Sequence, residues 1–332
     1  MNELLAIARH ITASSEPAGV LATLVSVTGS SYRRPGARLL LTPHGTRLGS
    51  ISGGCLEEDV LARATRVAAT GIADLVTYDT TSENDLVWGV GLGCHGVVQV
   101  FIEKLPPSPA WVATLAAHLR SHRPTPLAVV WRSTDPSLLG TRLASEAADL
   151  PASCGIFLHT VPPPVRLAIF GAGDDAQPLT RLAKELGWHV TVADPRRDFT
   201  TPARFPLADA LVVAPSPELV SRCALPSDAL AVVMTHHYVH DVPILRDLLV
   251  RDLPYVGLLG PKKRAARILA DLTADGATIT PAQRARLHAP VGLDLGAETP
   301  EEVALSIVAE MRATLAARDA RPLKERTRPI HD

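Results

Sequence analysis

The sequence predicts an α/β protein with a C-terminal Rossmann-like, doubly wound parallel sheet and an N-terminal α+β domain. At 332 residues the chain exceeds what one hydrophobic core usually supports. The stretch HTVPPPVRL is typical of a stiff connector, and β-rich runs alternate with helical stretches after it. We therefore expect an N-terminal domain over residues 1–160, a proline-rich linker over 161–164, a Rossmann-like domain over 165–320 and a flexible tail over 321–332.

The N-terminal domain is expected to open with an amphipathic helix, because Leu4, Leu5, Ala8 and Ile11 fall on one helical face. VLATLVSVTGSS then predicts a strand, and ARLLLTPHGTRLGSIS predicts two strands joined as a hairpin at residues 43–45. CLEEDVLARATRVAATG carries apolar residues at helical spacing, with Gly71 as the stop. LVWGVGLGCHGVVQVFIE predicts a glycine-punctuated strand, and residues 110–158 add a helix and the strand LAVVWRS.

The C-terminal domain is expected to alternate strands with helices. Short β-rich runs occur at VRLAIFGAG, HVTVADPR, ADALVVA, LAVVMTH and YVGLLGP, and DAQPLTRLAKELG predicts a helix that Gly187 ends. The final long helix has Thr299 as its expected N-cap, Pro300 at the first helical position and Glu302 completing a capping box. This alternation favours a parallel sheet with helices on both faces.

Composition excludes several classes of protein. The net charge is −1, so nothing indicates a nucleic-acid-binding surface. The N-terminus lacks an uninterrupted apolar run, and no window reaches the roughly 18 apolar residues that span a bilayer, so we expect neither a signal peptide nor a membrane segment. Four cysteines without a CxxC pair make no disulfide framework. We expect a cytoplasmic protein with reduced thiols.

A glycine turn follows the first predicted strand of the C-terminal domain. Gly171 and Gly173 belong to a G-x-G-x-x-A pattern that opens a helix, and Asp194 ends the next strand, where an acid would bind a ribose hydroxyl. Asp174 and Asp175 put two negative charges where a pyrophosphate would bind. A nucleotide-type ligand and a purely architectural turn both stay open.

Two further stretches follow predicted strands of this domain. GLLGPKKRAARIL crowds Lys262, Lys263 and Arg264 into the first turn of a helix, which is either a solvated basic face or, as we favour, a phosphate or carboxylate site. MTHHYVHD offers potential metal ligands, but the spacing lacks an i, i+4 helical pattern, and helix capping is the favoured interpretation. Its candidate ligands are His236, His237, His240 and Asp241.

The N-terminal domain has two glycine-rich turns, each with a cysteine, and an arginine-rich loop. In the loop GSSYRRPGAR, Arg33, Arg34 and Arg38 suit a bidentate grip on phosphate. Gly53 and Gly54 precede Cys55 and a helix, so their N–H groups can form an anion-binding concavity. For Cys55 or Cys94 taken singly, structural burial is the favoured interpretation, although glycine turns let a backbone come close to a ligand.

Taken together, these motifs resemble a known family. The phrases GSSYRRPGAR, SGGCLEEDV and GLGCHGVVQVFIE are similar to the N-terminal domain of the XdhC/CoxI family, accessory proteins of xanthine dehydrogenase-type molybdenum enzymes. LAIFGAGDDAQPLTRLAKELGWHVTVADPR, MTHHYVHDVPILRDLL, YVGLLGPKKRAARI and HAPVGLDLGAETPEEVALSIVAEM resemble that family's Rossmann domain. The resemblance covers nearly the whole chain in order, with His95 as a departure, since many relatives have glycine there.

The resemblance implies a non-catalytic role. Family members bind molybdenum cofactor, protect it while its terminal sulfido ligand is installed, and deliver it to the apo-enzyme. It further implies a cysteine desulfurase as sulfur donor, and we expect a homodimer. The cofactor is molybdopterin or its dinucleotide form, with NAD(P) as another candidate for the Rossmann turn. Our candidate cofactor-binding residues are Arg33, Arg34, Gly53, Gly54, Cys55, Cys94, Gly171, Gly173, Asp194, His236, Lys262 and Lys263, with Thr235 beside His236.

Within this set, Cys55 and Cys94 are the candidates for a contact with the molybdenum–sulfur end, because soft thiolates suit such a group. One alternative is an NAD(P)-dependent oxidoreductase that uses the Rossmann turn and Asp194, although no Tyr-x-x-x-Lys relay is found near the predicted sheet mouth. A metal-dependent hydrolase built on HHxxHD is the weakest of the three interpretations.

Overall fold

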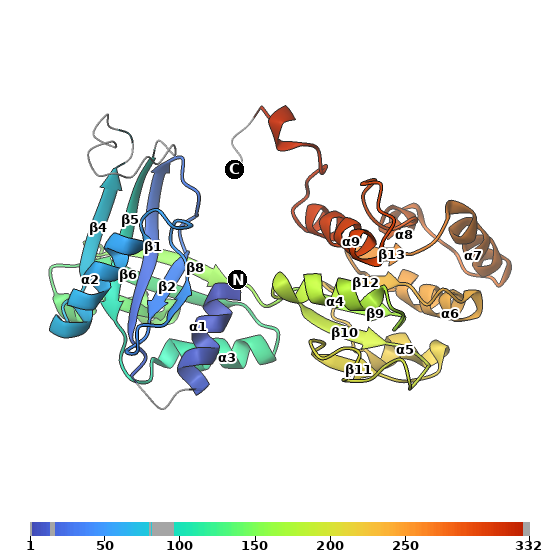
Figure 1. Cartoon of the computed structure of the whole chain (residues 1–332), viewed down its shortest axis with the longest axis horizontal. Coiled ribbons are helices and arrows are strands. Elements are labelled where there is room, and N and C mark those ends of the chain that lie inside the picture. The colour runs from blue at the N-terminus through green and yellow to red at the C-terminus, as the bar shows by residue number, and fades with distance from the viewer. Residues whose placement is uncertain (1, 14–16, 80, 82–95, 328–332) are drawn as a thin grey trace. The chain divides into compact units, whose positions relative to one another are not determined.

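The computed structural model describes residues 2–13, 17–79, 81 and 96–327. The chain divides into two compact units, Met1–Pro163 and Pro164–Asp332, and Figure 1 shows the elements of each. The predicted fold class is confirmed: an antiparallel α+β unit precedes a unit built on a parallel sheet. Cys94, His95 and the first part of the strand expected at 86–103 lie outside the described residues.

The N-terminal unit contains a five-stranded antiparallel sheet in the order β3-β2-β1-β5-β4. The predicted hairpin is present as β2 and β3, where Leu39 pairs with Gly49 and Leu41 with Arg47. The strands are β1 (Val20–Gly29), β2 (Arg38–Leu41), β3 (Arg47–Gly49), β4 (Asp74–Asp79) and β5 (Gly96–Lys104).

Helix α2 (Glu57–Thr70) covers one face of this sheet, and its apolar stripe includes Val60, Ala64 and Val67. It ends at Gly71, whose φ of 72° is the left-handed conformation that glycine adopts without strain. The opposite face packs on α1 (Asn2–Ala13), α3 (Ala110–Arg120) and a second antiparallel sheet, in which β6 (Thr125–Arg132) lies between β7 (Gly140–Leu143) and β8 (Gly155–Val161).

The C-terminal unit contains a six-stranded parallel sheet in the order β11-β10-β9-β12-β13-β14. Counted from its own first strand, this is the order 3-2-1-4-5-6 of dinucleotide-binding folds, so the strand order reverses between β9 and β12. Ligands of such sheets bind at this crevice, outside the carboxyl ends of the strands. The strands are β9 (Arg166–Phe170), β10 (His189–Ala193), β11 (Ala210–Val212), β12 (Leu230–Val233), β13 (Tyr255–Leu258) and β14 (Leu287–His288).

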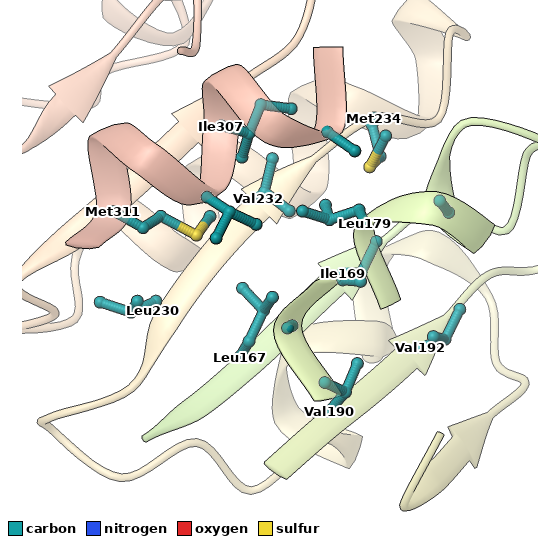
Figure 2. Close-up of a cluster of buried hydrophobic side chains, with 14 of the residues drawn as sticks. Leu167, Ile169, Leu179, Val190, Val192, Leu230, Val232, Met234, Ile307 and Met311 are labelled. Carbon is teal, nitrogen blue, oxygen red and sulfur yellow. The ribbon is translucent and has the colours of Figure 1, made fainter. Parts of the chain in front are cut away.

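Helices cover both faces of this sheet. Successive side chains of its strands point to opposite faces and are apolar on both, so each face has a hydrophobic core. On one face, α4 (Ala176–Glu185) and α9 (Pro300–Leu315) pack over β9, β10 and β12, as Figure 2 shows for Leu179, Ile307 and Met311. On the other face lie α5 (Ser216–Arg222), α6 (Tyr238–Leu249) and α7 (Lys262–Ala274). A short helix, α8 (Pro281–Ala285), precedes β14.

The last helix begins as the sequence predicts. Thr299 is the N-cap, its hydroxyl accepts the N–H of Glu302, and the Glu302 carboxylate accepts the N–H of Thr299 in return. Within the described part of the chain, no helix combines the length and apolar character needed to cross a membrane.

Candidate functional site

The turn between β3 and α2 carries the glycine–cysteine motif. Gly53 and Gly54 have φ values of 94° and 128°, which side chains rarely tolerate. Both glycines and Cys55 are exposed, whereas Leu56 and Glu57, which follow, are buried. The turn therefore presents its glycines and its thiol to solvent and directs an acidic side chain inward.

That acidic side chain fills the concavity formed by the turn. The Glu57 carboxylate accepts hydrogen bonds from the N–H groups of Ile51 (3.0 Å), Ser52 (2.9 Å), Gly53 (3.2 Å) and Gly54 (2.8 Å) and from the hydroxyls of Ser50 (2.8 Å) and Ser52 (2.5 Å). The N–H groups converge on an anion, as the glycine pattern predicts, but this anion belongs to the chain itself. An incoming phosphate would have to displace Glu57 to use the same donors.

The hydrogen bonds keep Glu57 ionised. Burial alone raises the pKa of this carboxyl, but the bonds from Ser52, Ser50 and Gly54 outweigh burial and lower the pKa to about 2. The turn thus holds a fixed negative charge at the start of α2, where the helix dipole favours it.

Cys55 is an exposed free thiol, so the expectation of structural burial is wrong for this cysteine. Cys154 and Cys223 are partly buried, and burial raises the pKa of the Cys223 thiol to about 12. Among the described cysteines, Cys55 is therefore the one most open to a ligand. Cys94, the second candidate thiol, is not among the described residues.

The three arginines of the GSSYRRPGAR loop have different surroundings. Arg33 forms a two-pronged ion pair with Glu3 of α1, at 2.7 and 2.5 Å, and this hydrogen-bonded pairing raises the pKa of Arg33. Arg34 is exposed and makes no ion pair with the residues that the structure describes. Arg34 is therefore the most exposed arginine of this loop and the one best placed to meet an anionic ligand.

Arg38, the third of these arginines, is buried between the two sheets of the N-terminal unit. Its Nη1 donates to the carbonyl of Gly36 (3.1 Å) and lies 3.3 Å from Nδ1 of His159. Burial lowers the pKa of Arg38 to about 10, and burial together with the Arg38 charge lowers the pKa of His159 to about 4. Arg38 anchors the loop and does not face solvent.

Tyr32 also belongs to this surface, and sequence reasoning missed it. Its side chain is 68% exposed, and its ring lies so close to Gly53 that a Cβ there would be 2.8 Å from Cε1 of the ring. This contact joins the arginine loop to the glycine turn. We call the exposed surface formed by Tyr32, Arg34, Gly53, Gly54 and Cys55 the Cys55 surface.

In the C-terminal unit, the glycine turn lies at the carboxyl end of β9, next to the end of β12. Gly171 has a φ of 125°, and a Cβ there would be 2.3 Å from the carbonyl oxygen of Met234. A Cβ at Gly173 would be 2.8 Å from Oδ1 of Asp175. Gly171 therefore needs to be glycine whether or not a ligand is bound, because its near neighbour is backbone, whereas a side chain at Gly173 would require the Asp175 carboxylate to shift.

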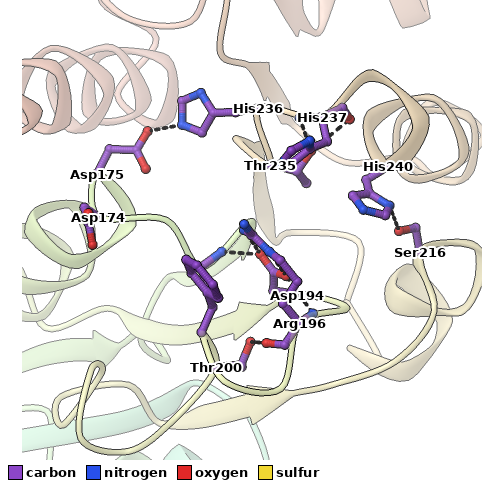
Figure 3. Close-up of polar contacts among 12 residues, drawn as sticks. Asp174, Asp175, Asp194, Arg196, Thr200, Ser216, Thr235, His236, His237 and His240 are labelled. Atoms are coloured by element: carbon purple, nitrogen blue, oxygen red, sulfur yellow. Dashed lines mark hydrogen bonds and ion pairs between the residues drawn. The ribbon is translucent and has the colours of Figure 1, made fainter.

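Asp194 is fully buried and already has partners for both carboxylate oxygens. It accepts the N–H of Ala172 at 2.7 Å and the guanidinium of Arg196 at 2.9 and 2.7 Å (Figure 3). Burial raises the pKa of Asp194, but the bonds from Arg196 and Ala172 prevail and lower it. The acid that the fingerprint assigns to a ribose hydroxyl is instead engaged in tying the glycine turn to the end of β10.

The two aspartates at the start of α4 have different roles. Asp174 is exposed and pairs with Arg204 at 2.9 Å. Asp175 accepts from His236 Nε2 at 2.7 Å, so a contact spans the crevice between the turns after β9 and β12 (Figure 3). His236 holds a left-handed φ of 61°, which is uncommon outside glycine. The buried Oδ1 of Asp175 has no hydrogen-bond partner among the described residues.

The potential metal ligands of MTHHYVHD diverge. His236 contacts Asp175, and His240 Nδ1 lies 2.8 Å from the Ser216 hydroxyl (Figure 3). Asp241 is buried against Thr235 and Arg264. Within the described residues no group of three histidine, cysteine or acidic side chains is placed to hold a metal ion. The geometry gives no support to the hydrolase interpretation.

The basic start of α7 has an internal counter-charge. Arg264 pairs with Asp241 and extends Nη1 to the carbonyl of His236 at 3.4 Å, which ties α7 to the turn after β12. Lys262 and Lys263 are exposed. Within this first turn of α7, the two lysines are thus the cations that stay available to an anionic ligand.

The contact between His236 and Asp175 predicts a pH dependence. The hydrogen bond to Asp175 raises the pKa of His236, so this contact stabilises the unit fully below the unfolded-state pKa of about 6.5 and ceases to do so as the pH rises through the raised folded value. In an NMR titration, the His236 ring protons should have their midpoint above that of a free histidine. Asp175→Asn should lower the midpoint, and Asp174→Asn should not. Equal midpoints in the wild type and Asp175→Asn would contradict the pairing.

The chain matches two family models. The XdhC Rossmann domain matches residues 167–311, and the XdhC and CoxI family matches residues 13–79. Over 315 residues the chain is 36% identical to a probable xanthine dehydrogenase subunit of Bacillus subtilis, covering 89% of this chain and 92% of that protein. Over 301 residues it is 24% identical to the molybdenum cofactor insertion chaperone PaoD of Escherichia coli, covering 88% of this chain and 82% of that protein.

A solved structure aligns with nearly the whole chain. The crystal structure of a xanthine dehydrogenase from Bacillus halodurans aligns with a TM-score of 0.79 at 31% identity. The alignment covers 96% of this chain and 98% of that one.

Proposed function

Because the chain belongs to the XdhC and CoxI family, we propose that it is an accessory protein that binds molybdenum cofactor and delivers it to a xanthine dehydrogenase-type apo-enzyme. The proposal includes protection of the cofactor while its terminal sulfido ligand is installed, with a cysteine desulfurase as sulfur donor, and a homodimer as the working form. The insertion chaperone from Escherichia coli, which aligns over most of this chain, supports a maturation role.

The Cys55 surface is the observation that carries the proposal, because it offers what each end of the cofactor needs. The cofactor has a phosphate, a flat pterin ring and a molybdenum–sulfur group. Arg34 can grip the phosphate, and the exposed thiol of Cys55 suits the soft metal–sulfur end. Cys94 is proposed as a second contact for the metal–sulfur end on the strength of the family resemblance alone.

In this proposal Glu57 stays hydrogen-bonded to the glycine turn while the cofactor is bound. Its N–H groups are engaged by the Glu57 carboxylate, so the turn contributes a rigid support for Cys55, and the positive charge for the phosphate comes from Arg34. Arg33 takes part indirectly, since its ion pair with Glu3 fixes the loop that carries Arg34.

The C-terminal unit is proposed to bind the nucleotide part of a dinucleotide form of the cofactor. The strand order and the turn at Gly171 and Gly173 support this, as do His236, Lys262 and Lys263, which follow β12 and β13. The same strand order supports the alternative, an NAD(P)-dependent oxidoreductase. In either case Asp194 must release Arg196 before it can accept a ribose hydroxyl.

Isolating the chain from a molybdenum-replete host separates the two functions. We expect molybdopterin and molybdenum to copurify with the protein and to be lost on denaturation. A protein that takes up no added cofactor, yet binds NADH stoichiometrically, would overturn the accessory function in favour of the oxidoreductase alternative.

Replacing Cys55 tests the thiol. In Cys55→Ala we expect activation of the client molybdoenzyme to fall roughly tenfold or more, since weakening even the outer contacts of a metal group typically costs that much. Cys154→Ala is the matched control, because Cys154 is a free, partly buried cysteine of the same unit, and it should leave activation unchanged. Full activation by Cys55→Ala would remove the thiol from the mechanism.

A further inference from the structure

Tyr32 has the most exposed ring among the aromatic side chains that the structure describes. The other strongly exposed aromatic side chain of the described residues is Phe199, and the guanidinium groups of Arg196 and Arg204 cover it, at 4.1 and 5.2 Å from the ring centroid. Tyr32 is 68% exposed, and no aromatic or cation contact to its ring is found among the described residues. An aromatic ring left open in this way is available to stack on a ligand.

The ring of Tyr32 lies against Gly53. A Cβ at Gly53 would lie 2.8 Å from Cε1 and 3.1 Å from Cδ1 of Tyr32, so only glycine lets the ring settle on this turn. The N–H of Gly53 donates hydrogen bonds to the hydroxyl of Ser50 and the carboxylate of Glu57, which fix the position of this glycine. The ring therefore rests on a backbone that is already fixed.

The loop that carries Tyr32 is fixed as well. Arg33, the next residue, is clamped to Glu3 by two hydrogen bonds. Further along, the N–H of Gly36 donates to Leu24 at 2.8 Å, and the N–H of Leu24 donates to Ala37 at 2.9 Å. A ring on a fixed loop, resting against a fixed turn, loses little freedom when a ligand binds, which makes it an efficient stacking platform.

The neighbours of the ring indicate the class of ligand. Arg34, two residues further along the chain, is an exposed cation, and Cys55, two residues beyond Gly53, is an exposed thiol. A flat heteroaromatic ring that carries an anionic group and a soft sulfur-rich group matches this combination. We propose that Tyr32 stacks on the pterin ring system of the molybdenum cofactor, an inference that rests on the proposed function.

Conservative substitutions separate stacking from simple covering of Gly53. Tyr32→Phe keeps the ring, whereas Tyr32→Leu covers the glycine with an aliphatic group and removes the aromatic face. We expect the dissociation constant for molybdopterin, measured by equilibrium dialysis with the full-length protein, to stay within about twofold in Tyr32→Phe. In Tyr32→Leu it should rise about tenfold, within the range for loss of one aromatic–base stack. Phe199→Leu, the control aromatic in the C-terminal unit, should bind as the wild type does.

A second measurement distinguishes stacking from a structural effect. The rate at which a thiol reagent labels Cys55 should be the same in the wild type and Tyr32→Leu, since the turn itself is held by Glu57. Unchanged binding by Tyr32→Leu would overturn the inference and leave the proposed function standing. Weakened binding by Tyr32→Leu together with an altered rate of Cys55 labelling would also overturn the inference, because the variant would then have changed the turn itself. A wild-type protein that binds no molybdopterin would overturn the proposed function itself.

Discussion

Glu57→Gln is expected to lower the free energy of unfolding of the N-terminal unit by about 3 kcal/mol. This is the cost expected when a charged acceptor is removed and a buried donor is left without a hydrogen bond. Backbone N–H groups donate to both oxygens of Glu57, to Oε1 from Ile51 and to Oε2 from Gly54. Whichever way a glutamine amide is turned, its NH₂ group must face one of these donors. The loss should appear in thermal unfolding and as faster amide hydrogen exchange at residues 50–57.

Glu58→Gln is the matched control for this change, because Glu58 is exposed on the next position of the same helix. It should alter the free energy of unfolding by no more than about 0.5 kcal/mol. The wild-type advantage over Glu57→Gln also has a pH signature. Since folding lowers the pKa of Glu57 to about 2, the advantage is complete above the unfolded value of about 4.3 and is lost as the pH falls towards 2. Equal stability of the two variants at neutral pH would contradict the role given to Glu57.

Arg264→Met is expected to destabilise the C-terminal unit by about 3 kcal/mol, as when one partner of a buried ion pair is removed. Asp241 is 1% exposed, and without Arg264 the hydroxyl of Thr235, at 2.5 Å, is the one side-chain donor that the described residues would still offer to its carboxylate. Because Arg264 also reaches the carbonyl of His236, the variant should disturb the His236 titration as well.

Two further variants make this prediction specific to the buried charge. Lys263→Met removes an exposed cation from the same helical turn and should change the free energy of unfolding by no more than about 0.5 kcal/mol. Adding Asp241→Asn to Arg264→Met removes the unpaired charge and should recover part of the stability. A double variant that is less stable than the single one would show that charge burial is not the cause.

Local signals allowed most of the fold to be predicted. The capping box at Thr299, the stop at Gly71 and the turn at Gly171 each depend on residues close together in sequence, and all are present. The alternation of strands and helices after the proline-rich stretch likewise predicted the parallel sheet. The arrangement of the antiparallel strands could not be read in this way, since it depends on pairings such as β1 with β5 between segments far apart in sequence.

The candidate sites were less predictable because partners decide what a charged residue can do. The sequence places Glu57 next to the turn but does not show that its side chain folds back to accept the turn's own N–H groups. Likewise, Asp194 fits a ribose-binding pattern until Arg196 is seen to occupy its oxygens. Tyr32 was missed because its contact with Gly53 joins two loops that only the folded chain brings together.

The most direct test of the proposed function is transfer of the cofactor. A xanthine dehydrogenase-type apo-enzyme lacking molybdenum cofactor would be mixed either with the cofactor-loaded protein or with the same amount of free, sulfurated cofactor, and the recovery of its activity followed. The proposed function predicts faster and more complete activation from the loaded protein, reduced when the protein carries Cys55→Ala. Activation no better than that by free cofactor would contradict it.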